Sequence, residues 1–77
     1  MGINVLLFGQ VADITGKDIL KIPVVKNTNE LNQLLEKTYP ALKSIKYSIA
    51  VNKKVIQENT ALHNEDTVAI LPPFSGG

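Results

Sequence analysis

Apolar residues fill most of positions 3–8 and alternate between the two faces of a predicted strand. Both faces carry apolar side chains. Such a strand either lies in the middle of a sheet, where both faces are covered, or uses one face to contact a partner. One face would carry Ile3, Val5 and Leu7, and the other Asn4, Leu6 and Phe8.

Residues 9–15 predict a turn or a short helical piece, which Gly16 closes. A second strand follows at 17–24, with alternate residues directed inward. The connection between the two strands is either a hairpin at Gly16 and Lys17 or a longer loop. The inward residues of the second strand would be Leu20, Ile22 and Val24.

Helical spacing replaces the alternation at residues 27–38. The side-chain oxygen of Asn27 can accept a hydrogen bond from the Glu30 N–H, and Glu30 can reach back, as in a capping box. Pro40 disfavours helical geometry at Tyr39 and therefore ends the helix. The apolar stripe of this helix would be Leu31, Leu34 and Leu35.

Period-two alternation returns after the helix. Residues 52–54 predict a turn into a short strand at 55–56, and residues 62–66 are polar and turn-like. A final strand at 67–71 ends at Pro72, because proline cannot donate to the ladder. In the strand that starts at residue 46, one face would carry Tyr47, Ile49 and Val51, and the other Ser48, Ala50 and Asn52.

The order of these elements is β, β, α and then two or three further strands. It predicts an α+β fold in which one main helix packs across a mixed sheet of four to five strands. The first and last strands would be parallel neighbours in the middle, which explains why both are so apolar. With 77 residues, we expect one domain, residues 1–77, whose residues 72–77 form an extended tail.

Composition and charge exclude several classes of partner. The net charge is +1 and arginine is absent, so the sequence lacks the clustered positive charge that nucleic-acid binding requires. No apolar run is long enough to cross a bilayer, and no signal peptide is recognisable. The absence of cysteine excludes disulfides and thiolate metal sites. We therefore expect a cytoplasmic protein with neither nucleic-acid nor membrane partners.

The sequence offers little for catalysis within the domain. His63 is the single histidine and is interpreted as a solvated turn residue, because metal sites need several convergent ligands. Ser75 has no histidine base in the tail, and no phosphate-binding glycine loop occurs. We expect no metal, no bound cofactor and no catalytic activity of the chain alone. The carboxylates interpreted as surface charge are Asp13, Asp18, Glu58, Glu65 and Asp66.

The last six residues are the strongest functional signal. Pro72 and Pro73 favour an extended conformation of about 3.1 Å per residue, so that the tail would project roughly 19 Å. Gly76 and Gly77 have no side chains, so the terminal carboxylate can enter a narrow slot. Two glycines are also typical of a frayed end. Stiff prolines directly after a strand instead favour a tail that presents its carboxylate to other enzymes.

The tail and the strand before it resemble one family of small proteins. Residues 66–77, DTVAILPPFSGG, are similar to the ending of the small subunits of molybdopterin synthase, the MoaD family. That ending is acidic-x-V-A-x-x-P-P-x-S/T-G-G. The segments LFGQV at 7–11 and AVN at 50–52 extend the resemblance over essentially the whole chain. The resemblance implies a ubiquitin-like β-grasp fold.

The resemblance also implies a sulfur carrier for molybdenum cofactor biosynthesis. A MoeB-like activating enzyme would use ATP to adenylate the Gly77 carboxylate, and a persulfide sulfur donor would convert it to a thiocarboxylate. The MoaE-like large subunit would then transfer the sulfur to cyclic pyranopterin monophosphate, with the catalytic residues on that subunit. Gly77 would be the reacting residue, and Gly76 would let the tail pass close to the partner's backbone.

Apolar and aromatic residues near the tail are expected to dock on these partners, because such anchors dominate interface energies. Phe8 and Leu71 are interpreted equally well as core residues. Phe74 lies beyond the last paired strand, which favours the interface, and Leu6 is a further candidate. The residues expected to bind partners are Phe8, Leu71, Pro72, Pro73, Phe74 and Ser75.

Two positions depart from the family pattern. Ala12 stands where members often have a basic residue, which puts any ion pair with a partner at that position in doubt. Glu65 stands where the family tends to have glycine. We expect Asn64 to adopt the left-handed backbone conformation in its place, because asparagine tolerates that conformation.

Three other functions remain open. A sulfur carrier for thiazole biosynthesis shares the Gly-Gly ending but usually lacks the paired prolines, so Pro72 and Pro73 argue against it. A ubiquitin-like modifier would join its terminus to lysines of target proteins. A binding module would only add its tail to a partner's sheet.

Overall fold

Five strands, two α-helices and one short 3₁₀-helix occur in residues 2–72, the part of the chain that the computed structural model describes. Within these residues, no helix combines the length and the apolar character that crossing a bilayer requires. The elements are β1 (Ile3–Leu7), α1 (Gly9–Thr15), β2 (Ile19–Ile22), α2 (Thr28–Thr38), the 3₁₀-helix η1 (Pro40–Ser44), β3 (Ser48–Val51), β4 (Lys54–Ile56) and β5 (Thr67–Leu71).

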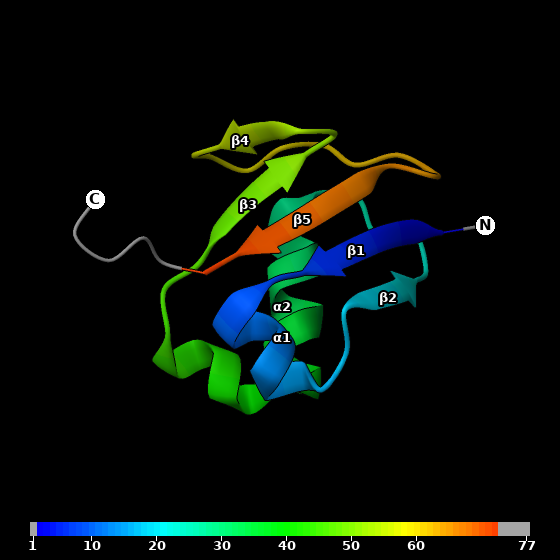
Figure 1. The fold of residues 1–77 in the computed structure, drawn as a ribbon. Coiled ribbons are helices and arrows are strands. Elements are labelled where there is room, and N and C mark those ends of the chain that lie inside the picture. Colours follow the sequence, from blue (N-terminus) through cyan, green and yellow to red (C-terminus); the bar gives the residue numbers. More distant parts are fainter. Residues whose placement is uncertain (1, 73–77) are drawn as a thin grey trace.

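The most apolar strands lie side by side at the centre of the sheet (Figure 1). The strand order is β2-β1-β5-β3-β4, with β1 and β5 parallel and the other neighbours antiparallel. Val5 lies opposite Val68, and Leu7 lies opposite Ile70. The structure therefore confirms the α+β class, the β-grasp fold and the central parallel pair.

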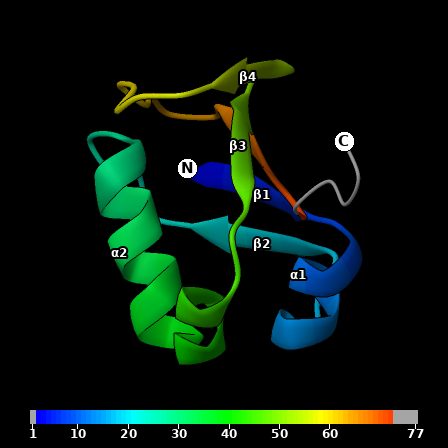
Figure 2. The same cartoon turned by 90° about the vertical axis from the view of Figure 1, so that its left-hand side faces the viewer.

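The helix α2 packs across one face of the sheet, which we call the inner face (Figure 2). Inward side chains of β1, β5 and α2 form a core from which solvent is almost excluded. Burying each large apolar side chain contributes roughly 1.5–3 kcal/mol, so this contact holds the layers together. The apolar residues at most 3% exposed in these three elements are Ile3, Val5, Leu7, Leu31, Leu35, Val68 and Ile70. Of the two apolar faces of the first strand, the one with Ile3, Val5 and Leu7 is thus the one that packs in the core.

Three positions differ from the pattern-based expectation. Leu62 lies in the stretch predicted as a polar turn, yet it is buried in the core. Leu42, to which no pattern assigned a place, is fully buried on η1. Val24 is predicted to point inward, which is wrong: it is 48% exposed, because β2 ends at Ile22 and Pro23 cannot continue the ladder.

The connection between β1 and β2 is the longer of the two alternatives. It contains α1, which Gly16 ends in the left-handed conformation at φ 73°. The Gly16 N–H donates to the Ala12 carbonyl at 2.8 Å. Glycine adopts this φ without strain. β2 is shorter than the predicted strand at residues 17–24, because it begins at Ile19 and ends at Ile22, directly before Pro23.

The ends of α2 follow the predicted signals closely. Asn27 Oδ1 accepts the Glu30 N–H at 3.0 Å. The Glu30 carboxylate does reach back, but it accepts the N–H of Lys26 at 3.0 Å, one residue before the expected partner. Tyr39 leaves helical geometry at φ −128° and ψ 82°, directly before Pro40.

The turn before β5 corrects one expectation. Glu65 itself is left-handed, with φ 69°, so the prediction that Asn64 takes over this geometry is wrong. Hydrogen bonds to Gly2 hold the turn: the Glu65 N–H donates to the Gly2 carbonyl at 2.7 Å, and Asn64 Oδ1 accepts the Gly2 N–H at 2.9 Å. A residue with a Cβ costs roughly 1–2 kcal/mol in this conformation.

We expect Glu65→Gly to raise the free energy of unfolding by about 0.5–1 kcal/mol and the thermal midpoint by about 3–6 °C. Glycine relieves the strain, while its freedom in the unfolded chain offsets part of the gain. Thermal unfolding followed by circular dichroism measures the shift. Asn64→Gly is the control, because it relieves no strain and removes the hydrogen bond to Gly2. A higher midpoint for Asn64→Gly than for Glu65→Gly would contradict this explanation.

Candidate functional site

The face of the sheet opposite α2, which we call the outer face, is turned toward the viewer in Figure 1. Its composition follows from strand alternation. Because Val68 and Ile70 of β5 point into the core, the residues between and beside them point outward. Ala69 lies between Leu6 of β1 and Ala50 of β3. The centre of the outer face is therefore apolar.

A hollow of about 430 Å³ lies on this face, and we call it the outer-face hollow. One part is apolar and the other is polar, with a single lysine. Such a surface suits a partner that buries apolar side chains at the centre and places a carboxylate at the rim. The apolar part is lined by Leu6, Phe8, Ala69 and Leu71, and the polar part by Asn52, Lys53 and Thr67.

Phe8 follows β1 directly and lines the outer-face hollow. Its side chain is 45% exposed, so the core interpretation of this residue is wrong. Leu71, at the end of β5, is only half-buried and lines the same hollow, as does Leu6. The structure thus brings together the three apolar residues in the described region that the sequence nominated for docking.

The base of the tail lies at the edge of the sheet where both central strands end. β1 and β5 are parallel, so Gly9 and Pro72, which follow them, are neighbours. A Cβ on Gly9 would lie 3.0 Å from Pro72 Cγ, and Gly9 has φ 55°. Glycine therefore permits the close approach of the two segments. The predicted site residues Pro73, Phe74, Ser75, Gly76 and Gly77 lie outside the described residues.

A hydrogen-bonded turn forms the polar end of the outer-face hollow. Asn52 and Lys53 connect β3 to β4 with φ 50° and 74°, as in a two-residue hairpin turn. The Asn52 amide donates to Asp66 Oδ1 at 3.0 Å, and its Oδ1 accepts the Thr67 N–H at 3.0 Å. Asp66 also accepts the His63 N–H at 2.8 Å. Asp66 is thus a structural acceptor and not the plain surface charge that its position predicts.

These contacts lower the pKa of the Asp66 carboxyl, chiefly through the Asn52 hydrogen bond and next through the His63 N–H. A lowered pKa in the folded state means that Asp66 stabilises the fold above its unfolded pKa, about 3.9. This stabilisation is lost as the pH falls through the folded value. Protonation of Asp66 is therefore one reason why the fold loses stability in acid.

We expect Asp66→Asn to be less stable than the wild type by about 1 kcal/mol at pH 7, since hydrogen bonds to a charged acceptor are lost. The difference should shrink as the pH falls from about 4 through the lowered pKa of Asp66 in the fold, because the carboxyl is protonated first in the unfolded chain and then in the folded one. Thermal unfolding between pH 2 and pH 7 tests this. Asp13→Asn, an exposed change on α1, is the control. A difference for Asp66→Asn that is constant with pH would rule out the ionic origin.

The described residues include no group of side chains arranged for metal binding or nucleophilic catalysis. Within residues 2–72, no three His, Cys, Asp or Glu side chains converge as a metal site would require. His63 is exposed in the turn before β5, as expected, and its ring lies 3.7 Å from Asp66 Oδ2. The described residues of the outer-face hollow supply no acid, base or nucleophile pair.

Four residues of the outer-face hollow were not predicted from the sequence as site residues. Two of them, Ala69 and Thr67, were detectable, because they share the strand face of Leu71. The other two, Asn52 and Lys53, come from a turn distant in sequence. Only the pairing of β3 with β5 places that turn beside the hollow.

Comparison with known proteins identifies the family. The profile of the ThiS family matches residues 5–77. The chain belongs to the ThiS family. Its relatives include proteins named molybdopterin synthase sulfur carrier subunit. The protein of this name from Dictyostelium discoideum is 34% identical, over 96% of this chain and 94% of that protein. The one from Arabidopsis thaliana is 32% identical, over 97% of this chain and 82% of that protein.

Solved structures of similar fold span the whole domain. Subunit 1 and 2 of the molybdopterin-converting factor from Helicobacter pylori form a protein–protein complex; the matching chain has 28% identity, full coverage of both chains and a TM-score of 0.73. The small archaeal modifier protein 1 (SAMP1) from Methanosarcina acetivorans has 25% identity, a TM-score of 0.83, and coverage of 97% of this chain and 95% of that one. SAMP1 from Haloferax volcanii matches this fold at 21% identity, full coverage of both chains and a TM-score of 0.83. The proteins similar to this chain thus include a sulfur carrier subunit and a small modifier by name.

Proposed function

We propose that this ThiS family protein is the sulfur carrier subunit of a molybdopterin synthase. The observation that carries the proposal is the position of Pro72: the tail begins at the edge of the sheet beside an exposed apolar hollow. A partner that binds the outer face is therefore placed to receive the tail. Relatives that match nearly the whole chain bear the name of this carrier, which supports the assignment.

The reaction begins at the terminal carboxylate of Gly77. An oxygen of this carboxylate attacks the α-phosphorus of ATP on an activating enzyme, and pyrophosphate leaves. The sulfur of an enzyme persulfide then attacks the acyl carbon, and AMP leaves. A second thiol cleaves the resulting S–S bond, so that the carrier departs as a thiocarboxylate and the two enzyme sulfurs are left as a disulfide. Adenylation is needed because a free carboxylate is an unreactive electrophile, whereas the acyl adenylate has AMP as a leaving group.

Two glycines suit this chemistry for different reasons. A Cβ at position 77 would crowd the attacked carbon, whereas Gly76 lets the tail approach another backbone closely. Ordering both residues in a partner's pocket costs roughly 2–4 kcal/mol of conformational entropy. Docking of the outer-face hollow offsets that cost. The absence of cysteine also leaves no internal thiol to consume the activated terminus.

The large synthase subunit supplies the catalytic residues in this proposal. It accepts the tail and transfers sulfur to cyclic pyranopterin monophosphate, and the Gly77 carboxylate is regenerated. The two-subunit complex of the Helicobacter pylori relative supports such a partner. Leu6, Phe8 and Leu71 form the apolar part of the docking surface.

Intact-mass analysis tests the carrier function. The full chain is incubated with a competent activating enzyme, ATP and a persulfide donor. We expect a gain in mass equal to the exchange of one oxygen for sulfur. An unchanged mass, while the same enzyme loads its own carrier, would refute the proposal. Addition of the large subunit and the pterin precursor then separates the molybdopterin function from thiazole biosynthesis.

A second candidate function is protein modification, which the likeness to SAMP1 favours. A modifier would transfer its activated Gly77 carboxyl to a lysine amine of a target, with an isopeptide bond as product. Mass spectrometry of proteins captured with a tagged chain would detect the corresponding branched peptide. Its complete absence under conditions that load the terminus with sulfur would remove this candidate.

A further inference from the structure

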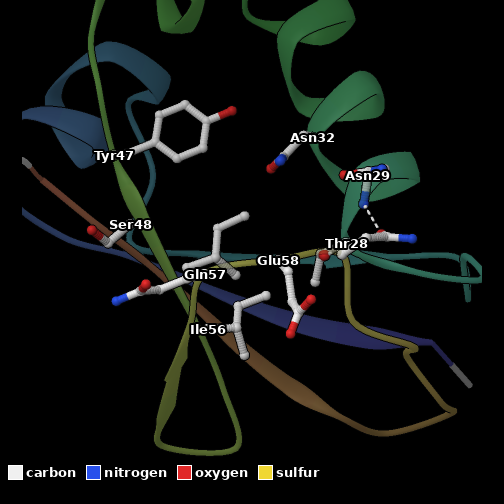
Figure 3. Close-up of a pocket in the computed structure, with 10 residues that line it drawn as sticks. Thr28, Asn29, Asn32, Tyr47, Ser48, Ile56, Gln57 and Glu58 are labelled. Carbon is white, nitrogen blue, oxygen red and sulfur yellow. Dashed lines mark hydrogen bonds between the residues drawn. The ribbon is translucent and has the colours of Figure 1, made fainter.

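A second groove lies between α2 and the strands β3 and β4, on the side of the sheet that α2 covers (Figure 3). Its volume is about 300 Å³. Ile49 and Ile56 contribute its apolar surface, and Tyr47 stands at one end with its O–H donating to Glu36 at 2.7 Å. The groove is at the lower end of the size range of ligand pockets, so it suits a single side chain.

The helix start beside this groove offers nothing to an anion. The first N–H groups of α2 already donate to other partners: Thr28 to the Thr60 carbonyl at 2.9 Å, and Asn29 to Asn59 Oδ1 at 2.9 Å. The Glu30 N–H donates to its capping residue. Free N–H groups are what makes a helix start attract anions. These three backbone N–H groups are therefore not free for a phosphate or a carboxylate.

One acceptor beside the groove, in contrast, lacks a partner. Asn32 extends from α2 into the space between the helix and β3 (Figure 3), and its Oδ1 is buried without a hydrogen-bond partner in the described part of the chain. An unsatisfied buried acceptor costs roughly 1–3 kcal/mol. No hydrogen bond holds Asn32 Oδ1. A half-turn about χ2, which exchanges the positions of Oδ1 and Nδ2, therefore directs the oxygen toward the groove without breaking a hydrogen bond of Oδ1. Glu58 adds a carboxylate to the same lining.

The charge of the groove is negative in a chain with net charge +1. Glu58 is the charged residue of its lining, and none of the eight lysines takes part. Two isoleucines beside an unpartnered acceptor and a carboxylate match an aliphatic chain that ends in a cation. Lysine has this form, with a long apolar stem and three N–H donors at the tip.

We propose that this groove binds a lysine side chain of a partner protein. The stem lies on Ile49 and Ile56, and the ammonium donates to Asn32 Oδ1 and to the Glu58 carboxylate. The partner is a basic segment that docks on the α2 side of the molecule. Because the outer-face hollow lies on the other face of the sheet, both surfaces can be occupied together. The proposal stands independently of sulfur transfer.

NMR titration of the ¹⁵N-labelled full chain tests the site. The probe is N-acetyl-lysine-N-methylamide, which carries the side chain on a peptide backbone. We expect saturable shifts at the amides of residues 28–32 and 57–59. The same compound acetylated on Nζ should cause none, because it lacks the cation. Free n-butylamine should bind more weakly than the peptide-linked probe; equal or tighter binding would overturn the choice of a protein lysine over a free amine.

Matched variants assign the contacts. Asn32→Leu and Glu58→Gln should each weaken probe binding about tenfold, since each loses one hydrogen bond to a charged donor. Gln33→Leu, on the exposed side of the same helix, and Asp13→Asn should bind as the wild type does. Asn32→Leu should also keep or raise the thermal midpoint, because it removes an unsatisfied acceptor. If Asn32 were needed for the fold, Asn32→Leu would instead lower the thermal midpoint.

Two results would overturn the proposal. One is the absence of saturable shifts at the groove in the wild type. The other is an affinity that Asn32→Leu and Glu58→Gln leave unchanged. Glu58→Gln alters an exposed side chain, so its folding does not compromise the measurement.

Discussion

A chain whose Gly77 ends in a carboxamide instead of a carboxylate is expected to accept no sulfur. Adenylation requires a carboxylate oxygen to attack the α-phosphorus of ATP, and an amide has no such nucleophile. The change keeps the length of the tail and every side chain. Its effect is therefore on chemistry and not on docking. The amide is prepared by ligation of a synthetic C-terminal peptide, and intact mass after incubation with the activating enzyme measures the loss.

Two controls accompany the carboxamide. A ligated chain with the ordinary carboxylate should load fully, which shows that the preparation does no harm. The carboxamide chain should bind the large subunit within about twofold of the wild type, because the outer-face hollow is intact. Sulfur on the carboxamide chain would show that the terminus is not the acceptor, and deletion of Gly76 and Gly77 would then also leave loading intact.

Phe8→Ala is expected to weaken binding to the large subunit by about 10–100-fold. Aromatic side chains at the centre of an interface commonly contribute 2 kcal/mol or more, and Phe8 is an exposed aromatic residue in the hollow beside the tail. Its exposure predicts little change in the free energy of unfolding, within about 0.5 kcal/mol. Calorimetric titration and thermal unfolding of the same samples measure both quantities.

Val24→Ala is the matched control for Phe8→Ala. Val24 is a similarly exposed apolar residue, at 48%, but it follows β2 and does not line the outer-face hollow. Its substitution should leave binding to the large subunit unchanged. If both substitutions weakened binding equally, the interface would not be centred on the hollow. If Phe8→Ala lowered the thermal midpoint by many degrees, the residue would belong to the core.

Local signals predicted most of the architecture. Both faces of β1 are apolar, and so is β5, which correctly indicated two central strands. The cap at Asn27 and the stop before Pro40 correctly bounded α2. These features were readable because each depends on residues close together in sequence: a side-chain period, a capping pair or a proline.

The errors arose where distant segments decide the outcome. Leu62 sits in a polar stretch and Leu42 in a short 3₁₀-helix, so neither has a periodic pattern around it, yet both fill the core. The backbone of Glu65 adopts a strained φ because its N–H donates to the carbonyl of Gly2, which lies 63 positions earlier in the sequence. Asn52 and Lys53 reach the docking surface only through strand pairing.

The sequence alone determined the order of strands and helices, the apolar residues where the tail begins and the family resemblance. These could be read because periodicity, prolines and motifs are properties of neighbouring residues. It left Phe8 and Leu71 undecided between core and interface. Only the tertiary structure placed them on the outer face, since exposure depends on which strand lies beside which. The groove at Asn32 was equally invisible, because an unsatisfied acceptor is recognised only when every segment around it is in place.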